Sequence, residues 1–90
     1  MAAASPYQAA LGVAVKRRRL ELELSQEQLS LRAELHQRWI SNVETGKRNP
    51  SYASIRRLAA GLGLAASELI ALAEQIEAHP DGRRTRSRNP

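Results

Sequence analysis

Apolar residues recur at helical spacing in several separate stretches of this 90-residue chain, and short polar or glycine-containing segments divide the stretches. In the first stretch, Leu11, Val15 and Leu22 share one face at the spacing of an amphipathic helix. The pattern predicts helices at about 7–22, 25–33, 37–45, 52–62 and 64–78. The fold class is therefore expected to be all-α, with these helices in one small domain.

Several of the predicted helix ends carry residues that satisfy free backbone groups. Ser25 and Gln28 form an S-x-x-Q pair, in which the serine oxygen accepts an amide hydrogen and the glutamine reaches back. Gly46 and Gly63 each follow a predicted helix, where glycine takes the left-handed conformation at little cost. Ser51 is placed to cap the fourth helix.

The third predicted helix has two chemically different sides. On a helical wheel of about 100° per residue, Ile40 faces inward with Val43, Glu44 and, one turn earlier, His36. The outward side consists of Gln37, Arg38, Ser41, Asn42 and Thr45, and Trp39 lies to one flank. Gln and Asn can each form two hydrogen bonds with adenine, and Arg with guanine. The side is either a base-reading surface or an ordinary solvated helix face.

Matches to a known pattern extend well beyond this helix, over about residues 8–73. They include the SQ pair at 25–26, the E-x-GKR-x-PS run at 44–51 and the LG-x-x-x-SEL segment at 62–69. With these matches the chain resembles the lambda-repressor-like (Xre/Cro) helix-turn-helix family. The resemblance implies a compact five-helix domain over residues 7–79, with the helix-turn-helix at its second and third helices.

The family resemblance also implies a function. It indicates a sequence-specific regulator of transcription that binds double-stranded DNA, a dimeric repressor or controller that reads a palindromic operator through the major groove. The alternative within the family is an antitoxin or co-regulator that acts mainly through protein contacts, with a toxin or polymerase as partner. The sequence does not choose between a phage-type repressor, a restriction–modification controller and an antitoxin.

The resemblance assigns roles to individual residues. The base-reading set is Gln37, Arg38, Ser41 and Asn42, and the phosphate-binding set is Gln26, Trp39, Lys47 and Arg48. Gln26 is also expected to support Gln37, although its position suits a simple first-turn role as well. Trp39 either offers its N–H to a phosphate or only covers core surface.

Other positions carry structural expectations from the same resemblance. Arg19 and Glu44 are expected to form a buried ion pair that ties the first helix to the third, fixing geometry more than adding stability. The family usually has glycine where this chain has Glu23 and Glu34. A left-handed conformation costs a non-glycine residue roughly 1 kcal/mol, so these turns are expected to be looser or differently shaped. Ala65 lacks the capping oxygen of the family's serine.

The last predicted helix has more apolar residues than one buried stripe needs. Ile70, Leu72, Ala73 and Ile76 form the predicted homodimer interface. The alternative is that Ile76 packs back on the first helix.

Composition narrows the function further. The net charge is +5, but four arginines and one aspartate after residue 79 supply +3 of it, so residues 1–79 carry only +2. Residues 80–90 are expected to be a flexible basic tail that adds salt-sensitive affinity for polyanions, and residues 1–6 a flexible N-terminus.

No catalytic constellation is visible, so an enzyme is not expected. The chain has no cysteine and no metal-binding spacing, so neither a metal nor a cofactor is expected. No apolar run approaches about 20 residues, which predicts a cytoplasmic protein without a membrane partner.

Overall fold

The computed structural model describes residues 5–79, and every regular element in this range is a helix. The helices are α1 (Pro6–Glu21), α2 (Gln26–Ala33), α3 (Gln37–Glu44), α4 (Tyr52–Gly61) and α5 (Ala66–Ala78). The predicted all-α class and the order of helices are confirmed. The main difference in boundaries is that α5 begins at Ala66 rather than Leu64, after a turn through Gly63 with a φ of 72°.

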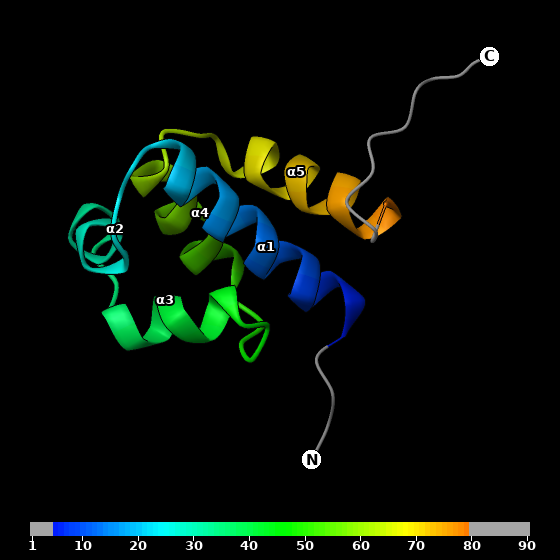
Figure 1. The fold of residues 1–90 in the computed structure, drawn as a ribbon, viewed down its shortest axis with the longest axis horizontal. Helices are drawn as coiled ribbons and strands as arrows, with labels where there is room; N and C mark the ends of the chain where they lie inside the picture. The colour runs from blue at the N-terminus through cyan, green and yellow to red at the C-terminus, as the bar shows by residue number, and fades with distance from the viewer. Residues whose placement is uncertain (1–4, 80–90) are drawn as a thin grey trace.

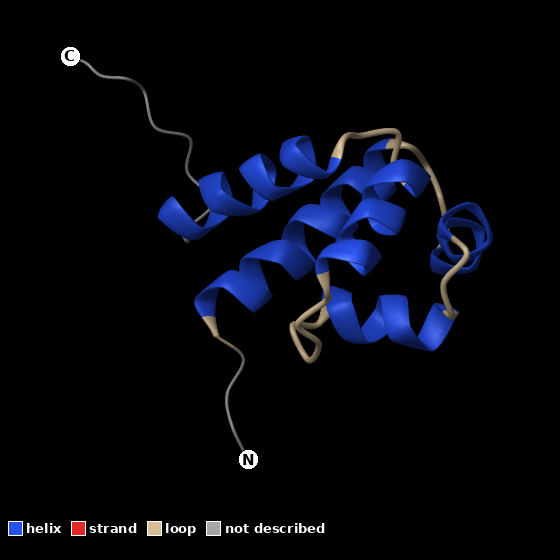
Figure 2. Ribbon diagram, turned by 180° about the vertical axis from the view of Figure 1, so that it is seen from behind, coloured by secondary structure: helices blue, strands red, loops and turns tan. Residues whose placement is uncertain are grey.

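Helix α1 lies at the centre of the arrangement. It packs along α5 on one side and against α3 on the other, while α4 contacts α2 and α5 (Figure 1). Seen from behind, the loop between α3 and α4 projects on the lower side of the molecule, where α3 also lies (Figure 2). The core between these helices is aliphatic, and its members are Leu11, Ala14, Val15, Leu29, Ala33, Ile40, Val43, Leu58, Ala59, Leu62, Leu69 and Ala73.

Serine side chains cap three of the helices at their N-termini. Ser5, Ser25 and Ser51 each accept a hydrogen bond from the backbone N–H three residues later. The predicted capping box at α2 is present, because Gln28 Oε1 also accepts from the Ser25 N–H at 2.8 Å. A serine oxygen at such a position contributes about 1 kcal/mol to helix stability.

Arginines satisfy backbone carbonyls at helix C-termini, a role that the hydrophobic pattern does not indicate. Arg18 and Arg32 donate from Nε to C-terminal carbonyls of α4, at distances of 3.0 and 2.8 Å. Arg57 donates to the carbonyl of Glu34 at the end of α2, at 3.3 Å. A cation is favourable at the negative end of a helix. These three positive charges therefore serve the fold.

The turns at Glu23 and Glu34 correct an expectation from the sequence. They are not differently shaped, because both residues adopt the left-handed conformation that glycine favours, with φ of 59° and 58°. Glu34 ends α2, and the following Leu35 N–H still bonds the Ser30 carbonyl at 3.0 Å. The surrounding structure holds these residues in an unfavourable conformation, at a cost of roughly 1 kcal/mol each.

Helix α5 also departs from the expectation. Ala73 is 9% exposed and belongs to the core, and Ile76 packs against that core. Ile70 is half-buried and Leu72 is 37% exposed, and they lie about 160° apart around the helix. The core thus takes up the side of α5 between Ile70 and Leu72, and Leu72 is the exposed member of the predicted set. The dimer interface itself stays a prediction.

Residues 5–79 contain neither a membrane-spanning helix nor a cluster of metal-binding side chains. None of the helices in this range combines the length and the apolar character needed to span a membrane. The same range holds no group of three or more His, Cys, Asp or Glu side chains arranged to bind a metal ion.

Candidate nucleic-acid interface

Helix α3 lies at one edge of the molecule, with the other helices on its inner side only (Figure 1). Ile40 and Val43 face the core and are 0% exposed. The residues predicted to read bases lie outside this inner stripe: Gln37 and Arg38 are exposed, and Ser41 and Asn42 are partly buried. The outer side of α3 thus presents an amide and a guanidinium to solvent, with a hydroxyl and a second amide behind them.

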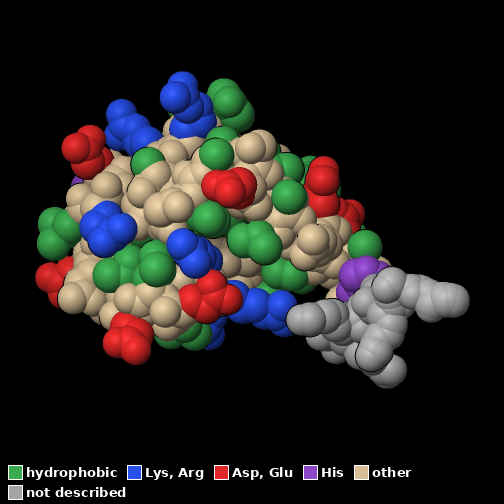
Figure 3. All heavy atoms as spheres, turned by 90° about the horizontal axis from the view of Figure 1, so that it is seen from above, with side chains coloured by type: hydrophobic (Ala, Val, Ile, Leu, Met, Phe, Trp, Pro, Cys, Tyr) green, Lys and Arg blue, Asp and Glu red, His purple; other side chains and the backbone are tan. Residues whose placement is uncertain are grey.

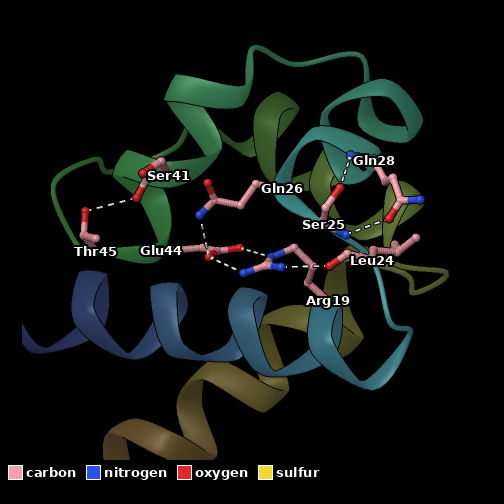
Figure 4. Close-up of polar contacts among 8 residues, drawn as sticks. All are labelled: Arg19, Leu24, Ser25, Gln26, Gln28, Ser41, Glu44 and Thr45. Atoms are coloured by element: carbon pink, nitrogen blue, oxygen red, sulfur yellow. Dashed lines mark hydrogen bonds and ion pairs between the residues drawn. The ribbon is translucent and has the colours of Figure 1, made fainter.

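Two other residues flank this region; His36 differs from the wheel, whereas Thr45 is exposed as the wheel predicts. His36 was expected near the inward side, but it is exposed and precedes α3 without a capping bond from its side chain. Thr45 Oγ1 donates to the Ser41 carbonyl at 3.1 Å, so its hydroxyl is engaged with the last turn of the helix (Figure 4).

An ion pair between α1 and α3 fixes the end of α3. Arg19 binds Glu44 through two contacts, Nε to Oε2 at 2.7 Å and a terminal nitrogen to Oε1 at 3.0 Å (Figure 4). Only 9% and 3% of the two side chains are exposed. The third guanidinium nitrogen donates to the Leu24 carbonyl at 2.8 Å. The structure thus contains the ion pair that the sequence predicted, in a two-pronged geometry that restricts rotation of either side chain.

Gln26 joins this pair from the first turn of α2. Its Nε2 donates to Glu44 Oε1 at 3.0 Å, and its carbonyl end points away from Glu44 (Figure 4). The hydrogen bond of Gln26 goes to Glu44 at the end of α3, and its support of Gln37 stays a prediction. An amide nitrogen carries two hydrogens, so one donor is not used by this bond.

The loop after α3 presents cations next to the helix. Gly46 has a φ of 78°, and the Lys47 N–H returns to the Asn42 carbonyl at 2.8 Å, which closes the helix end. Lys47 and Arg48 are exposed. Gln8 of α1 donates from Nε2 to the Gly46 carbonyl at 3.4 Å, a contact that sequence reasoning missed.

Trp39 is half-buried and packs against the core at the junction of α2, α3 and α4. It lines an open cleft there with Leu31, Leu35, His36, Gln37, Ser54 and Arg57, among others. Leu31 is 75% exposed in this cleft. The structure thus shows Trp39 covering core surface, and its contact with a phosphate stays a prediction.

Charge is distributed unequally over the molecule. The α3 side carries exposed Arg38, Lys47 and Arg48, while the only carboxylate of α3 is neutralised by Arg19. Helix α5 carries three glutamates and no lysine or arginine. On the α5 side, acidic, basic and apolar side chains are interspersed (Figure 3). Of these two sides, the α3 side is the one suited to a polyanion.

The described residues form five helices, and a short turn joins the second to the third. The polar side of α3 faces outward. This arrangement is that of the helix-turn-helix DNA-binding proteins. The chain belongs to the helix-turn-helix domain family, whose sequence model matches residues 10–72. The predicted family and its general function, a DNA-binding regulator of transcription, are therefore confirmed.

Relatives of this chain include controller proteins of restriction–modification systems. The control protein C.MunI from Mycoplasma sp is 39% identical over 54 residues, which are 60% of this chain and 73% of that protein. The crystal structure of the restriction-modification controller C.AhdI from Aeromonas hydrophila matches with a TM-score of 0.67 and 32% identity, over 69% of this chain and 94% of that one. A variant of C.Esp1396I, solved bound to its highest-affinity operator site, shares the fold with a TM-score of 0.75 and 23% identity, over 82% and 97% of the chains.

Proposed function

We propose that this protein controls transcription by inserting α3 into the major groove of a specific DNA sequence. One observation carries the proposal. The outer side of α3 presents hydrogen-bonding side chains that match base edges, while its inner side is fixed to α1 through a buried ion pair. Gln37 and Asn42 suit adenine, Arg38 suits guanine, and Ser41 accepts or donates at either.

The residues around α3 supply contacts that position the helix without reading sequence. Lys47 and Arg48 follow α3 on an exposed loop, where they can reach phosphates on either side of the groove. Gln26 has a second amide hydrogen for a phosphate oxygen, and its first is held by Glu44. The Trp39 indole N–H completes the proposed phosphate-binding set.

A homodimer follows from the small size of the reading element. An eight-residue helix contacts few base pairs, whereas two copies about 34 Å apart read both halves of a palindromic site. C.MunI and C.AhdI are controller proteins, and the C.Esp1396I variant is bound to an operator, which supports a controller of this kind.

The dimer interface must use surface that the core leaves free. Leu72 is the exposed member of the predicted set, whereas Ile76 packs against the core, so replacing Ile76 would also destabilise the monomer. We expect Leu72→Asp to reduce the sedimentation coefficient to that of a monomer at micromolar concentration. An unchanged coefficient would place the interface elsewhere.

The function is tested by selection from a pool of random DNA duplexes at near-physiological salt, read by sequencing. Enrichment of an inverted repeat with half-site centres about one helical turn apart supports a dimeric reader of sequence. Binding without any enriched sequence would mean that phosphate contacts dominate. The proposal would then give way to a regulator that acts through protein contacts.

A further inference from the structure

One side of α1 contacts the end of α3 at three levels. Gln8, Gly12 and Arg19 are spaced so that they lie within about 40° of one another around the helix. Arg19 holds the Glu44 side chain, and Gln8 holds the Gly46 carbonyl just beyond α3. Gly12 lies between them in α1.

At Gly12 the backbone of α1 closely approaches the backbone of α3. A Cβ on residue 12 would lie 2.7 Å from the Glu44 carbonyl oxygen and would overlap the Val43 carbonyl oxygen. These are backbone atoms, so no side-chain rotation could relieve the overlap. Glycine is unfavourable inside a helix, and its presence in α1 is explained by this close approach.

Gln8 is oriented at both ends of its carboxamide. The Ser5 hydroxyl donates to Gln8 Oε1 at 3.0 Å, and Gln8 Nε2 donates to the Gly46 carbonyl at 3.4 Å. Gly46 immediately precedes Lys47, the first proposed phosphate contact of the loop. The first turn of α1 is thereby connected to the segment that would lie along the DNA backbone.

We propose that Gly12 and Gln8 are positioning residues that set the angle of α3 and of the loop after it, and through that angle the specificity of DNA binding. The inference rests on the proposed function for its consequence. The orientation of α3 itself is measurable in the free protein. A small rotation of α3 moves the ends of Gln37 and Arg38 away from base edges, whereas phosphate contacts by long, mobile cations tolerate it.

The test compares Gly12→Ala with Gly61→Ala. Gly61 is also a closely packed helical glycine, although less tightly than Gly12: its Cβ would lie 3.0 Å from the side-chain atoms Ala33 Cβ and Leu29 Cδ1, and it packs α4 against α2. Residual dipolar couplings of backbone amides report the orientation of α3 relative to α1. We expect a rotation of α3 in Gly12→Ala only. We also expect the ratio of affinities for the selected and a scrambled duplex to fall about tenfold or more, the effect of losing one good base contact.

A second pair keeps the test decisive if Gly12→Ala does not fold. Gln8→Met removes the bond to Gly46, and Gln28→Met makes the same substitution at the matching position of α2, where the side-chain hydrogen bond goes to the Ser25 N–H of the same helix start. Rotation and lost specificity in Gln8→Met alone support the proposal. The proposal would be overturned if Gly12→Ala and Gly61→Ala gave the same helix orientation and specificity, and Gln8→Met and Gln28→Met did so too. A wild-type protein without sequence preference would refute the proposed function, yet the dipolar couplings would still decide whether α1 positions α3.

Discussion

Helices α3 and α5 both pack against α1, but they are held in different ways. Leu69 and Ala73 attach α5 through aliphatic contacts, at 0% and 9% exposure. Helix α3 adds an ion pair and a close backbone approach at Gly12 to its aliphatic contacts. Well-packed aliphatic side chains already orient a helix, and the two-pronged ion pair restricts the angle of α3 further. Helix α3, whose angle matters for the proposed reading of bases, is the helix with the directional contacts.

The outer sides of the two helices differ in the same sense. Helix α3 presents amide and guanidinium groups, whereas α5 presents Glu68, Glu74 and Glu77. Carboxylates on α5 keep that side away from phosphates and favour water. The outer side of α3 therefore suits the proposed contact with DNA, whereas α5 completes the core.

The largest predicted effect concerns the ion pair of α3. Arg19→Ala or Glu44→Ala leaves one charge buried without its partner, which costs about 3–5 kcal/mol of unfolding free energy in urea titrations. The joint replacement Arg19→Met with Glu44→Leu should recover most of that loss but lower the specificity ratio. If the joint variant kept full specificity, the ion pair would not be fixing the angle of α3.

A comparable loss of stability on α5 should leave specificity intact. Leu69→Ala creates a cavity at a fully buried site and costs about 2–5 kcal/mol in the same titration. Measured at a temperature where the variant is folded, the ratio of affinities for the selected and scrambled duplexes should equal that of the wild type. A lowered ratio would show that α5 also positions α3, and the contrast between the helices would fail.

A smaller effect distinguishes the turns that lead into the two helices. Glu34 lies in the turn before α3 and has a φ of 58°, and Gly63 lies in the turn before α5 and has a φ of 72°. Glu34→Gly should raise the unfolding free energy by about 1 kcal/mol, and Gly63→Ala should lower it by about the same amount. In thermal unfolding, a change of this size moves Tm by about 4–8 °C for a domain of this length. Shifts of the same sign in both variants would refute this explanation.

Helical periodicity and capping residues allowed the fold to be predicted. The stripes of Leu11 and Val15 in α1 and of Ile40 and Val43 in α3 locate the core, because each repeats along a single helix. Resemblance supplied the partnership of Arg19 with Glu44. Its geometry could not be predicted, because it depends on how two distant helices approach.

The missed features are contacts between segments far apart in the sequence. Gln8 bonds Gly46 and Arg18 reaches the end of α4, and neither residue has a periodic signal. Gly12 did carry a signal in the sequence, because an isolated glycine within a helical pattern often marks close packing. Ala73 was misassigned to a dimer surface because a wheel of one helix does not show how much of it α1 and α4 cover.

The most direct test of the account is the binding of Gln37→Ala with Asn42→Ala to the selected and the scrambled duplex. The account predicts that the ratio of the two affinities falls about a hundredfold or more, because two base contacts are lost. Binding to the scrambled duplex and the unfolding free energy should change little. Gln75→Ala, at an exposed position of α5, should leave the ratio unchanged. A double variant that keeps the wild-type ratio would show that the outer side of α3 does not read DNA.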